Sequence, residues 1–126
     1  MGAPTTPPLY EVWHDGGFLV SEANGHQSRD QVTLGGGALV LAGTVLGAIT
    51  ASGVFAPLNT GASDGSQTAA GILFGTRDTT SANKQAVVVL RNAEINASEL
   101  IWPAGATGPQ IATATGQLKA LGVILR

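Results

Sequence analysis

The run Gln85-Ala86-Val87-Val88-Val89-Leu90-Arg91 decides the fold class of this chain. Its consecutive valines form the strongest β-strand signal in the sequence, because β-branched side chains pack well on a pleated surface. Other apolar runs of strand length stand on both sides of it, at residues 44–49, 53–58, 69–74, 94–95, 100–102 and 123–125. Turn-forming residues separate these runs, most clearly around Asp64-Gly65. The chain is therefore predicted to be mainly β.

One short helix is predicted near the C-terminus, between Thr107 and Gly122. Thr107 and Gln110 fit a capping box, and Pro109 stands in the first turn, where its missing N–H costs nothing. Apolar and small residues follow at helical spacing, namely Ile111, Ala114, Thr115, Leu118 and Leu121. Gly122 is suited to end the helix in a left-handed conformation.

Residues 1–38 are predicted to form an extended N-terminal arm, and residues 39–126 a β-rich domain. The first eight residues contain three prolines. Two short apolar islands follow, Tyr10, Val12 and Trp13 and then Phe18, Leu19 and Val20, with glycine turns after each. Neither island has partners nearby for a core of its own, and such islands suit strand addition to another chain.

Composition excludes several classes of function. Charged residues make up 11% of the chain, against about 25% in ordinary soluble domains, so part of the uncharged surface is expected to face another protein. Lys84 and Lys119 are the only lysines, and no cationic cluster for phosphate exists, so direct nucleic-acid binding is not expected. Six glycines interrupt the weakly polar residues 34–55, so no membrane span is predicted.

No catalytic, cofactor or metal site is predicted. His14-Asp15 and the pair His26 and Asp30 lie in the predicted arm, which cannot supply preorganised geometry. There is no Gly-x-Ser-x-Gly motif and no cysteine, and the two histidines match no zinc spacing. The triple glycine at residues 35–37 lacks the Gly-Lys-Ser/Thr of a phosphate-binding loop. The residues describe a binding or structural module.

The second half of the chain resembles the head decoration proteins of lambda-like phages. The similarity lies in Asp64-Gly65-Ser66-Gln67-Thr68-Ala69-Ala70-Gly71-Ile72-Leu73, the valine-rich strand, Ala93-Glu94-Ile95-Asn96, Glu99-Leu100-Ile101-Trp102-Pro103 and the closing helix and strand. It covers roughly residues 40–126. Residues 12–18 and 28–30 resemble a longer-armed branch of the same family.

This resemblance implies a compact domain of the β-clip or β-tulip type. It also implies a homotrimer on the exterior of the phage head, at local threefold axes of the expanded capsid, that resists the pressure of packaged DNA. The six arm residues would contact the major capsid protein, and the protein would reside in the host cytoplasm during assembly. Deleting residues 1 to about 34 would then leave a folded trimer that no longer binds heads. Trp102, Pro103, Leu100 and Ile72 would form the core or the trimer interface.

The burial of Trp102 and an alternative function give two further expectations. A fully buried Trp102 would cost about 3–5 kcal/mol on replacement by alanine, since aromatic rings dominate core packing. The alternative function is a β-rich module of a phage tail or baseplate that recognises a host glycan. Such a module would need aromatic side chains in a groove, and the chain has six aromatic residues in all.

Overall fold

The computed structural model describes residues 15–23 and 27–126, and within them the chain is mainly β with one C-terminal helix, as predicted. One 3-10 turn, η1 (Ala97–Glu99), precedes helix α1 (Gly108–Ala120). The strands are β1 (Leu19–Glu22), β2 (Arg29–Leu34), β3 (Leu39–Val40), β4 (Val45–Ala48), β5 (Phe55–Pro57), β6 (Ala69–Leu73), β7 (Arg77–Asp78), β8 (Lys84–Val89), β9 (Ala93–Ile95) and β10 (Val123–Leu125).

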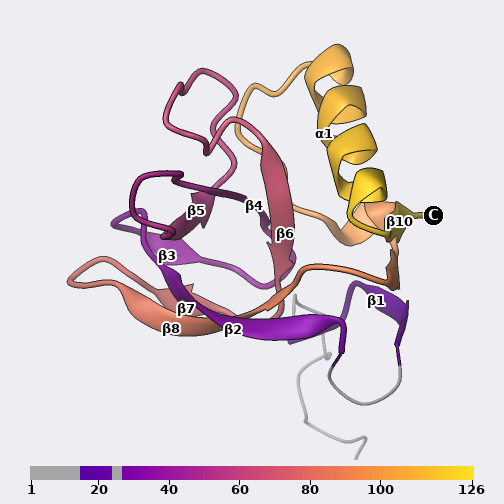
Figure 1. Ribbon diagram of the computed structural model, residues 1–126, viewed down its shortest axis with the longest axis horizontal. Coiled ribbons are helices and arrows are strands. Elements are labelled where there is room, and N and C mark those ends of the chain that lie inside the picture. The colour runs from indigo at the N-terminus through magenta and orange to yellow at the C-terminus, as the bar shows by residue number, and fades with distance from the viewer. Residues whose placement is uncertain (1–14, 24–26) are drawn as a thin grey trace, which may run out of the picture.

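Five of these strands close into a barrel in the order β2-β5-β4-β6-β8 (Figure 1). β8, the valine-rich strand, is antiparallel to both of its neighbours, and its pairing with β2 runs from Arg29↔Val89 to Leu34↔Lys84. Closure removes the exposed edges that an open sheet would leave. The strongest strand signal in the sequence thus forms part of the barrel wall. The finer β-clip or β-tulip class stays a prediction.

A three-stranded sheet in the order β1-β9-β10 lies beside the barrel, with β9 in the middle. β9 is antiparallel to β1 and parallel to β10. Helix α1 packs against β10 and against β6 of the barrel, and it stands along one side of the molecule in Figure 1. β3 and β7 form a separate two-stranded sheet.

The helix begins and ends where the sequence predicts. The Thr107 hydroxyl accepts a hydrogen bond from the Gln110 backbone N–H, and the Gln110 side chain accepts one from the Thr107 N–H, which completes the capping box. Gly122 has φ +86°, a left-handed conformation that favours glycine. Ala114 and Leu118 are the buried residues of the helix.

The core consists of two clusters that share three barrel strands. Successive side chains on a strand point to opposite faces, so two adjacent residues of each strand enter different clusters. The pairs are Val45 and Leu46 from β4, Ile72 and Leu73 from β6, and Val89 and Val88 from β8. The first cluster also takes in Ala114 and Leu118 of α1. Burial on both faces explains why these strands read as unbroken apolar runs rather than as alternating ones.

The predicted boundary between arm and domain at residue 38 needs correction. β2 forms one wall of the barrel, and its Leu34 is fully buried. Phe18 is 2% exposed and belongs to the first core cluster, against which Leu19 also packs. The described residues before 39 are therefore part of the β domain. Residues 1–14 and 24–26 of the predicted arm lie outside the described residues.

Close packing of the barrel on its long loop gives a test of the fold. A Cβ added to the buried Gly47 of β4 would lie 2.3 Å from the Ser66 backbone carbonyl oxygen. We expect Gly47→Ala to lower the free energy of unfolding by about 1–3 kcal/mol through overpacking. A Cβ added to Gly116 on α1 would meet no atom within 4 Å, so Gly116→Ala should instead raise it by about 0.5–1 kcal/mol. Chemical denaturation measures both, and equal effects would contradict this packing.

Candidate functional site

The three predicted arm residues that the structure describes differ in their exposure. Phe18 is buried and Leu19 is half-buried, whereas Val20 is 57% exposed. Tyr10, Val12 and Trp13 lie outside the described residues. The second island is therefore divided between the core and the surface, and Val20 is the member that can contact a partner.

Val20 lies on β1, which is an edge strand of the β1-β9-β10 sheet among the described residues. An edge strand presents backbone N–H and C=O groups with which another chain's strand can pair. β1 is also the first strand after residues 1–14. The backbone groups at the edge of β1 are thus suited to strand addition.

The segment that leads into β1 is fixed to both parts of the domain. The Gly16 N–H donates to the Phe74 carbonyl oxygen at 2.9 Å, next to the barrel strand β6. The Asn96 N–H donates to the Phe18 carbonyl oxygen at 2.8 Å, beside β9. The Arg29 guanidinium of β2 forms an ion pair with Glu22 of β1 and lies 4.3 Å from the centre of the Phe74 ring. Barrel and sheet therefore hold this segment together.

The predicted core or interface residues separate into two kinds. Ile72 is fully buried and Leu100 is 8% exposed, and both belong to the first core cluster. Trp102 and Pro103 are half-buried and line an open hollow of about 220 Å³. Its other lining residues include Leu39, Leu41, Pro57 and Ile101. We call this surface the Trp102 hollow.

Partial exposure of Trp102 changes the expected effect of its replacement. The ring packs against the first core cluster on one side and faces the Trp102 hollow on the other. We expect Trp102→Ala to lower the free energy of unfolding by about 1–3 kcal/mol, less than for a fully buried ring. Thermal unfolding of the two proteins measures this. A loss at the upper end for core aromatics would show that Trp102 is fully covered in solution.

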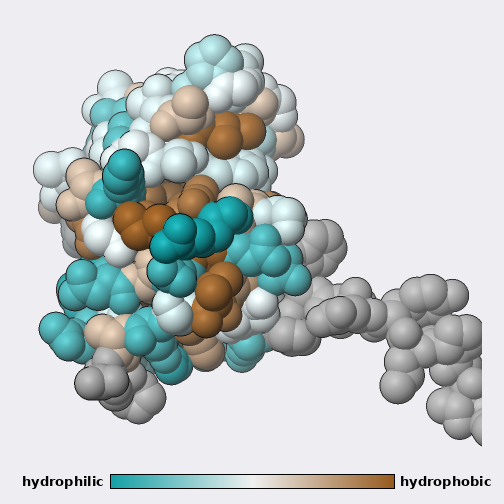
Figure 2. All heavy atoms as spheres, turned by 90° about the vertical axis from the view of Figure 1, so that its right-hand side faces the viewer, coloured by the Kyte–Doolittle hydropathy of each residue, from teal (hydrophilic) through white to brown (hydrophobic). Residues whose placement is uncertain are grey.

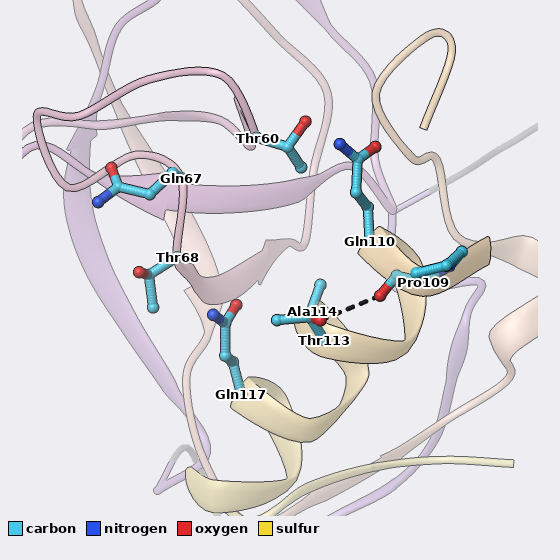
Figure 3. A pocket seen from close by; sticks show the side chains of 8 residues that line it. All are labelled: Thr60, Gln67, Thr68, Pro109, Gln110, Thr113, Ala114 and Gln117. Carbon is cyan, nitrogen blue, oxygen red and sulfur yellow. Dashed lines mark hydrogen bonds between the residues drawn. The ribbon is translucent and has the colours of Figure 1, made fainter. Parts of the chain in front are cut away.

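A second groove, of about 350 Å³, lies between α1 and the loop before β6 (Figure 3). Its glutamines support the local backbone. The Gln67 side-chain oxygen accepts from the Gly65 N–H, and that of Gln117 accepts from the Ala69 N–H, each at 2.8 Å. In the same loop, the Ser66 hydroxyl donates to Asp64 and holds the pKa of that carboxyl below its usual range. The polar groups that line this groove are amides and hydroxyls, and no general base lies among them to activate a nucleophile. The groove therefore has no set of catalytic residues.

Residues 15–23 and 27–126 contain neither a cluster of metal ligands nor a membrane-spanning helix. No three His, Cys, Asp or Glu side chains in that part of the chain gather closely enough to hold a metal ion. Among the same residues, no helix has the length and apolar character needed to cross a membrane. His14 and His26 lie outside the described residues.

Comparison with known families decides between the two predicted functions. Residues 8–123 match the sequence model of the bacteriophage lambda head decoration protein D family. This chain belongs to that family. A search of curated proteins found no match. The family match begins at residue 8, so it includes Tyr10, Val12 and Trp13 as well as the whole barrel.

Membership of the decoration protein D family fixes the general role. The chain is a phage head decoration protein, which is a capsid component of the virion head surface that binds the capsid. The family is structural and not catalytic, so the chain is not an enzyme. The alternative of a tail or baseplate module for a host glycan gains no support, because the match is to a head protein.

Proposed function

We propose that this decoration protein binds as a homotrimer at the local threefold axes of the expanded capsid and stabilises the head against the pressure of packaged DNA. The match to the decoration protein D family over residues 8–123 is the observation that carries the proposal. The partner is the major capsid protein. The protein would join the head in the host cytoplasm during assembly.

The anchoring of β1 supports a mechanical role. If Tyr10, Val12 and Trp13 bind a capsid-protein strand, any outward force on the shell reaches the domain through Asp15 and Gly16. That point is hydrogen-bonded to Phe74, and two residues later the chain is fixed by the buried Phe18. Force would therefore load a closed barrel and its core rather than a loose linker.

Stabilisation then follows from linkage. A protein that binds the expanded shell and not the unexpanded one shifts the equilibrium towards the expanded shell in proportion to its differential affinity. Three arms on one trimer would bind together, and linked sites raise overall affinity by a factor of about 10²–10⁴ over one arm. Modest contacts of each arm with the capsid would thus suffice.

Cryo-electron microscopy of decorated expanded heads tests the placement. We expect three copies of the domain around each local threefold axis, with residues 1–14 directed towards the capsid protein. In parallel, DNA-filled heads are heated with and without the protein, and decorated heads should release DNA at a higher temperature. Density at the centres of hexamers, or an unchanged release temperature, would contradict the proposal.

A further inference from the structure

Three separate parts of the chain meet at the aromatic ring of Phe74, which directly follows β6. The Arg29 guanidinium of β2 lies 4.3 Å from the centre of this ring. Both carboxylate oxygens of Glu22 on β1 accept hydrogen bonds from the same guanidinium, one of them from Nε at 2.8 Å. Gly16 packs closely against the ring, since an added Cβ would lie 2.7 Å from Phe74 Cε2. We call Gly16, Glu22, Arg29 and Phe74 the Arg29 cluster.

The two contacts of Arg29 depend on the shape of a guanidinium. This planar group donates two parallel hydrogen bonds to one carboxylate and also stacks on an aromatic face, whereas a lysine ammonium is a point charge. The side chains of Arg29 and Glu22 are 22% and 18% exposed, so water and salt screen this ion pair less than the Arg91–Asp30 pair, whose side chains are 40% and 51% exposed. Arg29 thus joins β1 to the Phe74 ring in a way that no other side chain reproduces.

The Arg29 cluster lies at the start of the β domain. Gly16 has φ +68°, a left-handed conformation that favours glycine, and its N–H donates to the Phe74 carbonyl oxygen. The Asp15 side chain lies over Gly75, where an added Cβ would be 2.8 Å from Asp15 Oδ2. Phe74 therefore holds this part of the chain through both its backbone and its ring, and Arg29 holds the ring. These contacts fix the position of Asp15, to which the preceding segment is joined.

The surface beside β1 gives that preceding segment a particular importance. On the side of the molecule that carries α1, β10 and β1, hydrophilic residues separate the hydrophobic patches (Figure 2). Arg126 pairs with Glu94 there at 2.8 Å. Such a mixed surface is ordinary for a solvated face. The apolar Tyr10, Val12 and Trp13 are better suited to contact the capsid, so the direction in which the domain presents them matters for binding.

We propose that Arg29 is a positioning residue for capsid binding, which holds Phe74 and β1 in the arrangement that directs residues 1–14 towards the capsid protein. The proposal rests on the proposed function and names the residue that positions the binding segment. A segment joined to the domain in a fixed direction loses less freedom on binding than one whose point of attachment moves, so its association costs less entropy. Without Arg29, the cluster should open locally while the barrel stays folded.

Amide hydrogen exchange of the free protein, followed by NMR, tests whether Arg29 holds the start of the domain. The reporter is the Gly16 N–H, and the reference is the Leu73 N–H, which donates to the Thr44 carbonyl oxygen at 3.0 Å. In Arg29→Met we expect exchange at Gly16 to speed up at least about tenfold more than exchange at Leu73. Equal acceleration at both amides would show a general loss of stability and would overturn the proposal. Arg29→Lys, which keeps the charge but not the paired hydrogen bonds, gives the same comparison if Arg29→Met does not fold.

Co-sedimentation with expanded heads, at a temperature where every variant is folded, tests the consequence for binding. We expect Arg29→Met to bind at least about tenfold more weakly than the parent protein. Arg91→Met is the matched control, because it removes the Arg91–Asp30 ion pair and leaves the Arg29 cluster intact, so it should bind like the parent. Normal binding by Arg29→Met, or an equal loss in both variants, would overturn the proposal. Failure of the parent protein to bind heads would instead contradict the proposed function, and the exchange at Gly16 would still decide whether Arg29 holds this part of the chain.

Discussion

Replacing Phe18 with alanine is expected to lower the free energy of unfolding by about 3–5 kcal/mol, the usual cost of removing a buried ring. Phe18 is 2% exposed and packs in the cluster that joins the barrel, β9 and α1. The loss should appear as a lower midpoint in chemical denaturation with an unchanged slope. Among the described residues that precede β2, Phe18 is the one whose replacement should lower the free energy of unfolding most.

Val20→Ala is the control for Phe18→Ala, because Val20 lies two residues further along and is 57% exposed. Its replacement should change the free energy of unfolding by less than about 0.5 kcal/mol. If both variants unfold like the parent protein, Phe18 belongs to an arm after all, and the corrected domain boundary is wrong.

Deleting residues 1–14 is expected to leave the domain folded and to weaken its binding to expanded heads by more than about 100-fold, because three linked arm contacts are lost at once. The deletion keeps the barrel, the β1-β9-β10 sheet and both core clusters, so we expect the melting temperature to stay close to that of the full chain. Binding is measured by co-sedimentation over a range of protein concentrations. Normal decoration by the shortened protein would rule out the arm as the capsid-binding element.

A shorter deletion, of residues 1–7, is the matched control. It removes two of the prolines at residues 4, 7 and 8 but keeps Tyr10, Val12 and Trp13, and the family match begins only at residue 8. This protein should bind heads like the full chain. The longer deletion to residue 34 cannot test the arm, because it removes β1 and β2 and opens the barrel.

The strands that the sequence predicts are those that are buried on both faces or that end at recognisable turn residues. Val88 and Val89 enter different core clusters, and so do Ile72 and Leu73, so their unbroken apolar runs are visible without a structure. The helix is equally predictable from the sequence, because its capping box joins Thr107 and Gln110, which are three residues apart. Local signals of this kind need no knowledge of distant partners.

β2 was missed because only one of its faces is apolar. Asp30 and Gln31 are exposed, while Val32 and Leu34 pack in the second core cluster. The alternation of Gln31, Val32, Thr33 and Leu34 was the available signal, but its partner strand β8 lies about fifty residues further along, as the pair Val32↔Ala86 shows. Pairing at that distance cannot be derived from local propensity.

The sequence predicts that Trp102 and Pro103 pack in a core or an interface, but it does not tell which of the two. The sequence identified Trp102-Pro103 as an anchor, but it could not separate these residues from Leu100, which the structure places in the core. Leu39 and Leu41 carried no distinct signal, since an exposed leucine and a buried one look alike in sequence.

Co-sedimentation of the purified protein with expanded, undecorated heads and with unexpanded proheads tests the central claim most directly. We expect saturable binding to expanded heads and none to proheads. Equal binding to both forms would remove the stabilisation by linkage. Failure of a folded sample to bind either form would contradict the decoration function itself.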